Sequence, residues 1–598
     1  MCGIAGVIGS RLTRNELAEV LFGMQQRLNH RGPDDHGVFI SHDGRAALLN
    51  TRLSVLDLSH AAHQPMSSAD GRYHIVFNGE IYNFKELRDE LIADGERFRS
   101  DGDTEVVLKM FQRYGTECVR ELAGMFAFAI WDSIEESLFL ARDPLGVKPL
   151  YYTQNNSGVI FASEVHAIVR SGLVPRDLSS RALGGYLLYG AVPEPWTLVE
   201  GIQALPAGHH LKWRNGQKKV TKFWELQFHA DLIDHGEAVK AVRGALEESV
   251  QRHLISDVPV GVFLSGGIDS TAVVALASRV AGANLQTFSI SFADPNYNEG
   301  DVAERTARHF HTDHHDWRLD SASAKELLND FLVASDQPSI DGFNTYCVCK
   351  LAHDRGLKVV LSGLGGDEIF GGYQSFQLVP QMVRASRAFE PMRRAKGAAG
   401  KLLENFASSS PTKRLGHFLG QVPITATAYW AMRGIFTPRE VSNLLKGYGC
   451  DEQSGRSPTP HVPPQPTLED EVSYLEVTRY MRNQLLRDSD VMSMAWSLEL
   501  RVPFVDSRLV DCISRVPAAL RLGKGKRLLL DAVPEIPEWV RSRPKQGFTF
   551  PFEEWVTTQW RDVFAEIQSR SPVRLRNWYR TWCLFALENF LEKNALTL

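Results

Sequence analysis

The pattern of apolar and polar residues changes near the middle of the chain. Up to about residue 225, short apolar runs alternate with polar breaks, and GMFAFAIWD (124–132) and SLFLARD (137–143) predict two neighbouring buried strands. The run YHIVF (73–77) predicts a strand that ends in a turn at Asn78-Gly79. FKELRDELIADG and TEVVLKMFQRYG have helical spacing and end in glycine. A layered α/β or α+β domain, in which strands dominate, is therefore expected here.

From about residue 235 the pattern predicts strands that alternate with helices. AVKAVRGALEESVQRHL (238–254) is an amphipathic helix, and the apolar run from Val258 to Leu264 predicts a buried parallel strand. LQTFSISF (285–292) and the apolar residues before SGLGGDE (362–368) predict two more strands of the same sheet. Such an alternation indicates a doubly wound sheet, which binds ligands at the carboxyl ends of its strands.

Composition narrows the class of protein. A chain of 598 residues exceeds one hydrophobic core, so two large units are expected. The 66 basic and 71 acidic residues give a net charge of -5, which offers no electrostatic reason for a nucleic-acid or membrane partner. The 7 cysteines lack zinc spacing and fit free thiols in a reducing cytoplasm. No signal peptide and no apolar stretch of about 18 residues is present, so a cytoplasmic protein is expected.

The residue behind the initiator methionine is the first candidate for chemistry. If the methionine is removed, Cys2 carries both a thiol and a free α-amine, and that amine can act as base for its own thiol. The alternative is an ordinary second residue. Polar residues also stand where the predicted strands and helices begin or end, and each alone is explained by a cap, a turn or the surface; they are Arg52, Asn78, Gly79, Glu80 and Asp103.

The second candidate is the glycine-rich stretch SGGIDS, residues 265–270. It follows a predicted strand and leads into a helix that is expected to begin near Thr271. Backbone N–H groups and the positive end of the helix dipole make such a turn an anion site. No lysine follows, so it is not the GxxxxGK[ST] loop. It resembles instead the pyrophosphate loop SGGxDS of ATP pyrophosphatases.

Together these motifs resemble the glutamine-hydrolysing asparagine synthetase family over nearly the whole chain. MCGIAG, HRGPDDHG, TRLSVLDLS, HQPM, FNGEIYN and RDPLGVKPLYY occur in the order of a class II glutamine amidotransferase domain, and SGGIDS and LLRDSDVMSMAWSLELRVPFVD match the synthetase domain. The resemblance implies an αββα sandwich of the N-terminal nucleophile hydrolase type at residues 2–225. It implies a doubly wound ATP-pyrophosphatase domain at 235–598, with a Pro-rich excursion near 453–468.

The resemblance also implies site residues. In the amidotransferase domain Cys2 attacks the side-chain amide of glutamine, and Asn78 with the N–H of Gly79 forms the oxyanion hole. Glutamine is bound by Arg52, Leu53, Ser54, Val55, Asn78, Gly79, Glu80 and Asp103. In the synthetase domain Lys545 neutralises phosphate charge during adenylation, and Mg²⁺ is held by Asp269 and Asp367. ATP is bound by Leu264, Ser265, Gly266, Gly267, Asp269, Ser270, Ile290, Ser362 and Gly363. Asp490, Glu499 and Arg501 are expected to form a buried polar network.

The implied reaction uses ATP and glutamine to amidate a carboxylate through its acyl-AMP, with aspartate as the expected acceptor. One departure bears on that acceptor: the family's loop SGEGSDE reads SGLGGDE here, so Leu364 replaces an acidic residue. Asp336 and Asp341 are candidate substitutes, and a different carboxylate is the alternative. A homodimer is a further expectation. Three other classes are disfavoured. A lactam-forming cyclase typically lacks a working Cys2, and a catalytically silent binding protein would lose parts of SGGxDS or of the glutamine pocket, yet all are present here. A tRNA-modifying pyrophosphatase would need a basic face or paired cysteines, and the composition offers neither.

Overall fold

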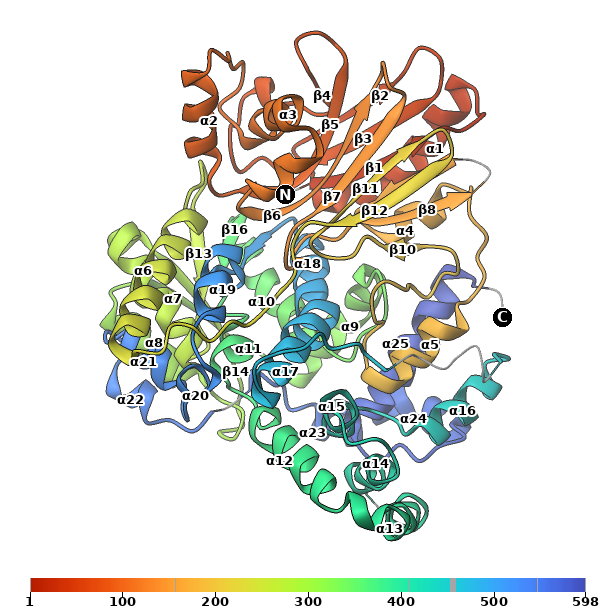
Figure 1. The fold of residues 1–598 in the computed structure, drawn as a ribbon, viewed down its shortest axis with the longest axis vertical. Coiled ribbons are helices and arrows are strands. Elements are labelled where there is room, and N and C mark those ends of the chain that lie inside the picture. Colours follow the sequence, from red (N-terminus) through yellow and green to blue (C-terminus); the bar gives the residue numbers. More distant parts are fainter. Residues whose placement is uncertain (1, 156–157, 408, 452–458, 546, 597–598) are drawn as a thin grey trace.

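The computed structural model describes residues 2–155, 158–407, 409–451, 459–545 and 547–596. A strand-rich half forms one end of the molecule, and the C-terminal half forms the remainder (Figure 1). All seven cysteines are free thiols. Among the described residues, no helix has both the length and the apolar character that crossing a membrane requires.

The N-terminal half is a sandwich of two antiparallel sheets between two layers of helices. One sheet has the strand order β10-β8-β9-β1-β3-β2 and the other β12-β11-β7-β6-β5-β4. The strands are β1 (Cys2–Ile8), β2 (Asp35–Ile40), β3 (Ala46–Arg52), β4 (Met66–Ser67), β5 (Tyr73–Ile81), β6 (Gly124–Asp132), β7 (Ser137–Arg142), β8 (Tyr151–Asn155), β9 (Gly158–Ala162), β10 (Gln203–Ala204), β11 (His209–Arg214) and β12 (Gln217–Lys222).

Both faces of the central strands of these sheets are buried, which explains their apolar runs. Along β1, Ile4 and Ile8 face the other sheet, whereas Ala5 and Val7 pack against α1 (Arg14–Leu28) and α4 (Val165–Arg170). The outer face of the second sheet packs against α2 (Phe84–Ala93) and α3 (Asp103–Tyr114). The αββα sandwich expected for this half is confirmed.

The predicted turn at Asn78-Gly79 is wrong. Strand β5 continues through both residues to Ile81, because Asn78 pairs with Ala127 and Gly79 with Phe126 of β6. A Cβ atom on Gly79 would lie 2.2 Å from the carbonyl oxygen of Met125. The glycine therefore allows a close approach of two strands rather than a reversal of the chain.

The C-terminal half contains a five-stranded parallel sheet of order β15-β14-β13-β16-β17, as expected. Helix α7 contacts β13, α10 contacts β14, and α18 contacts β17. Helix α7 begins at Ile268, three residues earlier than expected. The elements around the sheet are α6 (His235–His253), β13 (Val260–Phe263), α7 (Ile268–Ala281), β14 (Gln286–Ser291), α8 (Gly300–His309), β15 (Asp313–Arg318), α9 (Ser321–Ala334), α10 (Phe343–Asp354), β16 (Val359–Leu361), α11 (Gly366–Phe370), α18 (Arg487–Met494), β17 (Glu499–Arg501) and α19 (Ser507–Ser514).

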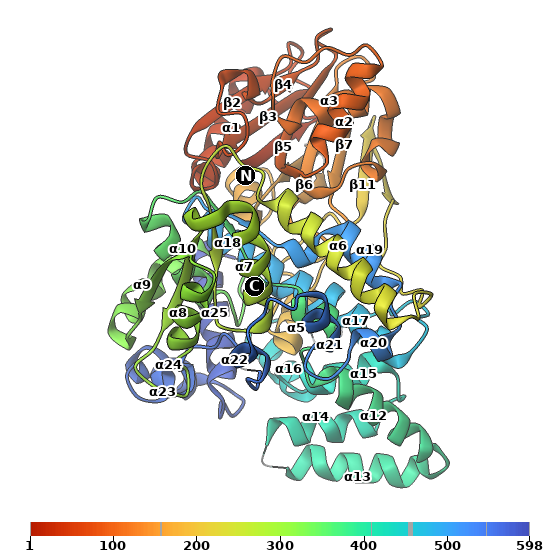
Figure 2. The same ribbon diagram turned by 90° about the vertical axis from the view of Figure 1, so that its left-hand side faces the viewer.

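A helical extension forms the end of the molecule opposite the sandwich (Figures 1 and 2). It has its own small core, in which Phe376 and Val379 pack with Phe418 and Tyr429. Its helices are α12 (Ser375–Ala388), α13 (Arg393–Phe406), α14 (Ser410–Leu419) and α15 (Thr425–Arg433). The remaining elements are α16 (Pro438–Gly447), α17 (Leu468–Leu475), η6 (Glu476–Leu486), α20 (Ala518–Arg521), α21 (Arg527–Ala532), α22 (Glu538–Arg541), α23 (Phe552–Thr557), α24 (Arg561–Arg570) and α25 (Trp578–Asn594).

Two segments near the expected domain limits pack in ways the sequence did not indicate. Helix α5 (Ser180–Tyr189) precedes the expected boundary, yet the Tyr186 hydroxyl donates to the carbonyl oxygen of Cys583 on α25 at 2.7 Å. Residues 453–458 of the Pro-rich segment lie outside the described residues. In its described part, the side-chain oxygen of Gln465 accepts a hydrogen bond from the N–H of Phe228 at 3.2 Å. The limits 2–225 and 235–598 stay a prediction.

Candidate functional site

Cys2 is the first residue of β1, and its side chain is 6% exposed. Pairing of β1 with β3 places it opposite Arg52. Its backbone nitrogen donates to Oδ1 of Asn78 at 3.1 Å, and its carbonyl oxygen accepts from Nε of Arg31 at 3.3 Å. Burial raises the pKa of the Cys2 thiol, and the Arg52 guanidinium opposes that effect. The sulfur is therefore a thiol that needs a nearby base to become a nucleophile.

Asn78 provides a buried donor that has no acceptor. Its Nδ2 atom has no hydrogen-bond partner among the described residues, although its Oδ1 is held by Cys2. Leaving such a donor unpaired costs about 1–3 kcal/mol, so the arrangement favours a ligand that accepts from it. Gly79 is the next residue of β5, and the oxyanion hole expected from these two residues stays a prediction.

The other residues that are expected to bind the substrate glutamine make different contacts in the structure. The Arg52 guanidinium donates to the carbonyl oxygens of Leu56 at 3.0 Å and Asp57 at 2.5 Å, which fixes its position beside the sulfur. Asp103 opens α3 and accepts from the N–H of Ile81 at 2.9 Å, and burial raises its pKa to about 6. The N–H of Ser54 donates to the carboxylate of Asp34. Leu53 and Val55 pack with apolar residues of the C-terminal half.

Glu80 contacts the C-terminal half, and its expected role in glutamine binding stays a prediction. It lies 3.5 Å from Nη2 of Arg501, on β17 of the other half, and burial together with Glu499 raises its pKa well above the usual value. Against the effect of burial, nearby positive charges, Arg501 and Lys148 among them, lower the pKa of Glu499 to about 2. Glu80 is thus part of a buried contact between the halves.

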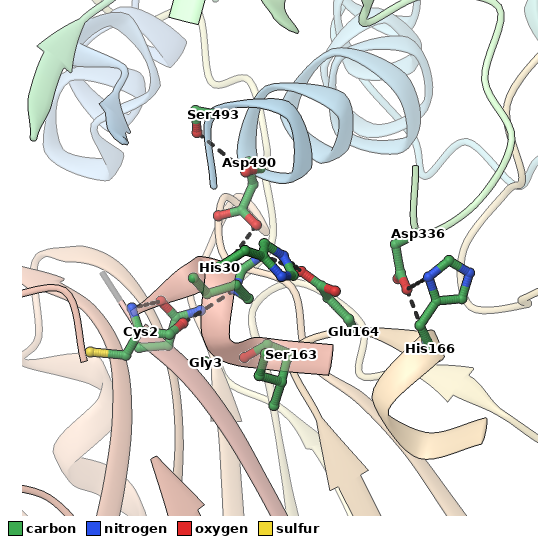
Figure 3. Close-up of polar contacts among 12 residues, drawn as sticks. Cys2, Gly3, His30, Ser163, Glu164, His166, Asp336, Asp490 and Ser493 are labelled. Carbon is green, nitrogen blue, oxygen red and sulfur yellow. Dashed lines mark hydrogen bonds and ion pairs between the residues drawn. The ribbon is translucent and has the colours of Figure 1, made fainter. Parts of the chain in front are cut away.

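A second buried network joins the halves through Arg31, and Figure 3 shows its two acids, Glu164 and Asp490. Arg31 contacts Glu164 through Nη1 at 3.0 Å and Asp490 through Nη2 at 2.7 Å. Lys148 lies 3.4 Å from the other oxygen of Asp490. Asp490, Glu499 and Arg501 are buried, as expected. Arg31 connects its network to Cys2, because its Nε donates to the carbonyl oxygen of Cys2.

The C-terminal half contains a cavity of about 1460 Å³ at the carboxyl ends of β13, β14 and β16. Ile290 is not part of its lining; the side chain is 3% exposed on β14, and the neighbouring Ser289 lines the cavity instead. The expected adenine contact of Ile290 therefore stays a prediction. The other expected residues of this half line the cavity: Leu264, Ser265, Gly266, Gly267, Asp269, Ser270, Ser362, Gly363, Asp367 and Lys545.

Glycines let two loops meet at this cavity. Gly266 has φ +71, a conformation that side chains rarely adopt. A Cβ atom on Gly363 would lie 2.7 Å from the N atom of Ser270 at the start of α7. The Ser265 and Ser270 hydroxyls lie 3.1 Å apart. The first turn of α7 thus offers hydroxyls and backbone N–H groups where phosphate oxygens can bind.

A cluster of two lysines and two aspartates lies beside this loop. Lys526 forms ion pairs with Asp269 and with Asp367, the latter at 2.5 Å, and Lys545 contacts Asp367 at 2.7 Å. Burial raises the pKa of Asp269 to about 6, and Lys526 counteracts it. Against the effect of burial, the two ammonium groups hold the pKa of Asp367 below its usual value.

The sequence analysis missed Lys526. It is buried and comes directly before α21, at the end of the turn Gly523-Lys524-Gly525-Lys526. The sequence here only alternates glycine and lysine, a pattern that is common in exposed turns and does not indicate a buried lysine. Only the fold brings it to Asp269, which is 257 positions away.

The same aspartates bear on Mg²⁺. Among the described residues, no group of three or more His, Cys, Asp or Glu is arranged to hold a metal. Oδ1 of Asp269 is nevertheless buried without a hydrogen-bond partner in that part of the chain. Mg²⁺ is commonly held by one or two carboxylates with phosphate oxygens and water, so the donor set fits a metal that arrives with ATP.

Of the two acids considered as substitutes at Leu364, one is wrong. Asp336 is buried away from the cavity, where its carboxylate accepts from the N–H groups of Val165 and His166 at 2.9 Å each (Figure 3). It therefore caps α4 of the N-terminal half. Asp341 does line the cavity, as does Leu364, and burial raises the pKa of Asp341.

Comparisons with known proteins cover both halves. The glutamine amidotransferase domain model matches residues 1–224, and the asparagine synthase model matches residues 241–593. Asparagine synthetase [glutamine-hydrolyzing] 1 of Bacillus subtilis is 34% identical over 588 residues, which cover 95% of this chain and 90% of that protein. A putative asparagine synthetase of Mycobacterium tuberculosis is 34% identical over 93% of this chain and 88% of its own length.

A third relative has a different kind of name. Amidase chry2 of Gibberella zeae is 27% identical over 96% of this chain and 92% of its own length. The matches to both domain models, together with 34% identity over nearly the full length, agree with the two sites described above. The chain therefore belongs to the asparagine synthase family and is a glutamine-dependent amidotransferase.

Proposed function

We propose that this chain moves the amide nitrogen of glutamine to a carboxylate that it first activates as an acyl-AMP. The expected acceptor is aspartate, so that ATP, aspartate, glutamine and water give AMP, pyrophosphate, asparagine and glutamate. Residues 2–225 would release ammonia and residues 235–598 would use it. The observation that carries the proposal is the position of Lys526 between Asp269 and Asp367, directly beside the loop SGGIDS.

The glutamine step uses the groups around Cys2. The sulfur attacks the side-chain carbonyl carbon of glutamine, and Asn78 Nδ2 with the Gly79 N–H stabilises the negative oxygen that develops. Arg52 holds the α-carboxylate of glutamine and Asp103 its ammonium group. Ammonia leaves as the thioester forms, and water later hydrolyses the thioester to glutamate. The mature α-amine of Cys2 would take the thiol proton.

The synthetase step uses the cavity. A carboxylate oxygen of the acceptor attacks the α-phosphorus of ATP and pyrophosphate leaves, while the hydroxyls of Ser265 and Ser270 and the ammonium groups of Lys526 and Lys545 balance the phosphate charge. Mg²⁺, held by Asp269 and Asp367, would add positive charge to the leaving pyrophosphate. Ammonia then attacks the acyl carbon and AMP leaves. Ammonia would pass between the halves, which two buried networks hold together.

One alternative acceptor class is kept because of Leu364. An apolar side chain lines the cavity where the family has an acid, and it cannot pair with the ammonium group of aspartate. Of the two candidate acids, Asp341 is the one that lines the cavity. A different carboxylate, amidated by the same mechanism, agrees with the existence of relatives that are named amidases.

Release of AMP and pyrophosphate tests the proposal. Aspartate should release both, with glutamate and asparagine formed only when glutamine is present. Cys2→Ala should abolish the use of glutamine and spare the use of added ammonia. If another acid is amidated and aspartate is not, the acceptor is wrong and the mechanism stands. If no acid releases pyrophosphate from the folded enzyme, the mechanism is wrong.

A further inference from the structure

Exposed large apolar side chains concentrate on the helical extension. Eight of the eighteen such side chains in the described part of the chain lie between residues 378 and 424. Phe406 is the most exposed of all, at 81%, and Leu402 is 60% exposed. Monomeric proteins rarely leave apolar side chains together on one surface without a partner. The eight are Leu378, Phe389, Met392, Leu402, Phe406, Leu415, Val422 and Ile424.

Exposed apolar residues form one stripe along α13. It begins at Met392, directly before the helix, and continues through Ala395, Ala399, Leu402 and Phe406 at spacings of three and four, which places them on one side of the helix. The opposite side of α13 is attached to the extension. Gly400 is the buried residue of α13, and a Cβ atom there would lie 2.5 Å from the carbonyl oxygen of Gly416 on α14. The stripe therefore faces away from the protein.

Basic residues flank the stripe. Arg393, Arg394 and Lys401 surround a groove of about 500 Å³ whose floor is Gly397 and Ala398. Residues 384–406 contain six basic and two acidic residues, whereas the whole chain has a net charge of -5. Both acids are engaged locally, since Glu390 pairs with Lys396 at 2.8 Å and Glu404 with His417 at 3.3 Å. Among the described residues, neither Arg394 nor Lys401 has an acidic partner.

We propose that this surface, the α13 face (Met392, Arg394, Ala399, Lys401, Leu402 and Phe406), docks on an anionic phospholipid bilayer. An apolar stripe beside a basic flank is typical of helices that lie in the plane of the headgroups. The groove between Arg393, Arg394 and Lys401 suits a lipid phosphate. With 14 residues, α13 is too short to span the bilayer, so it lies on the surface. The sequence predicts no membrane partner from total charge, and this local surface is the exception.

Charge complementarity favours lipid over a second copy of the chain. A two-fold contact would place the same patch against itself, and Arg394 and Lys401 would then face like charges. The extension lies at the end opposite the sandwich (Figures 1 and 2), so a bilayer that contacts α13 leaves the Cys2 half free. The docked enzyme would work beside the membrane.

Flotation of the full-length enzyme with vesicles tests this proposal. Vesicles of phosphatidylcholine with about 30 mol% phosphatidylglycerol should carry the enzyme, and neutral vesicles should carry far less. R394Q/K401Q should weaken binding about thirtyfold, because each basic residue near an anionic surface contributes a factor of about five. L402S/F406S should weaken it by more than about tenfold, because two exposed apolar side chains no longer enter the interface.

The matched control is K212Q/K219Q. These two lysines are exposed and pair across β11 and β12 on the sandwich, so the variant removes the same charge at a remote place. It should bind like the unaltered enzyme. All three variants should keep full glutamine-dependent activity without vesicles, which shows that they fold. Absent flotation, or equal loss in R394Q/K401Q and K212Q/K219Q, would overturn the proposal. So would a vesicle-free dimer that L402S/F406S dissociates, since the surface would then belong to a second copy.

Discussion

Arg31 and Asp490 are 459 positions apart and form a buried ion pair, with Nη2 and Oδ2 separated by 2.7 Å. Arg31 belongs to the sandwich and Asp490 to α18 of the C-terminal half. The same guanidinium donates to the carbonyl oxygen of Cys2. The backbone of Cys2 is therefore held by a residue that also pairs with the C-terminal half, so Arg31 links Cys2 to that half.

Asp490→Ala should destabilise the protein by about 3–5 kcal/mol, because it removes one of the two acidic partners of buried Arg31 and the acid that contacts buried Lys148. The control is Asp231→Ala, which removes the exposed partner of Arg515 at 3.2 Å and should cost about 0–1 kcal/mol. Urea unfolding followed by fluorescence measures both. Equal effects of Asp490→Ala and Asp231→Ala would contradict the proposed role of the pair.

Asn78→Asp separates the two functions of that side chain. The variant keeps an oxygen that can accept from the backbone nitrogen of Cys2, and it loses the Nδ2 donor. Removing one oxyanion donor lowers kcat on the order of 10²–10³. Glutamate release from glutamine should fall by that factor, while the rate with added ammonia stays unchanged. An unchanged kcat with glutamine would show that Asn78 is not in the oxyanion hole.

Asp103 predicts how glutamine binding depends on pH. Its pKa of about 6 lies above the usual value, so the carboxyl becomes neutral as the pH falls through about 6. The attraction for the ammonium group of glutamine is then lost, and KM for glutamine should rise on the acid side while kcat changes less. Asp103→Asn should have a high KM without that inflection. If the inflection persists in Asp103→Asn, another group is responsible.

Lys526→Met should abolish formation of the acyl-AMP. It leaves Asp269 and Asp367 close together without the ammonium group between them and removes a charge that balances phosphate. The rate of pyrophosphate release should fall on the order of 10²–10³, and glutamate release should remain. Lys240→Met is the control, since this lysine of α6 is exposed, lies outside the cavity lining and has no acidic partner among the described residues. Equal losses in both variants would contradict a specific role for Lys526.

The sequence predicted those features that local residue patterns determine. The strands, the stretch SGGIDS and Cys2 with Asn78 and Gly79 were recognisable because their residues lie within short motifs. The turn at Asn78-Gly79 was wrong because pairing with β6 overrides the local preference. Asp336 was misjudged because its partners, Val165 and His166, come from the other half. Lys526 and Arg31 were not recognised because their contacts exist only after the halves assemble.

The central claim is that one oxygen of the acceptor carboxylate passes to AMP. Acceptor labelled at that carboxylate with a heavy oxygen isotope should give AMP that carries one labelled oxygen, and the pyrophosphate should carry none. The measurement is mass spectrometry of the nucleotide after turnover with glutamine, first with aspartate and then with any other acid that is amidated. Unlabelled AMP, or label in inorganic phosphate together with ADP, would contradict an acyl-AMP and the account built on it.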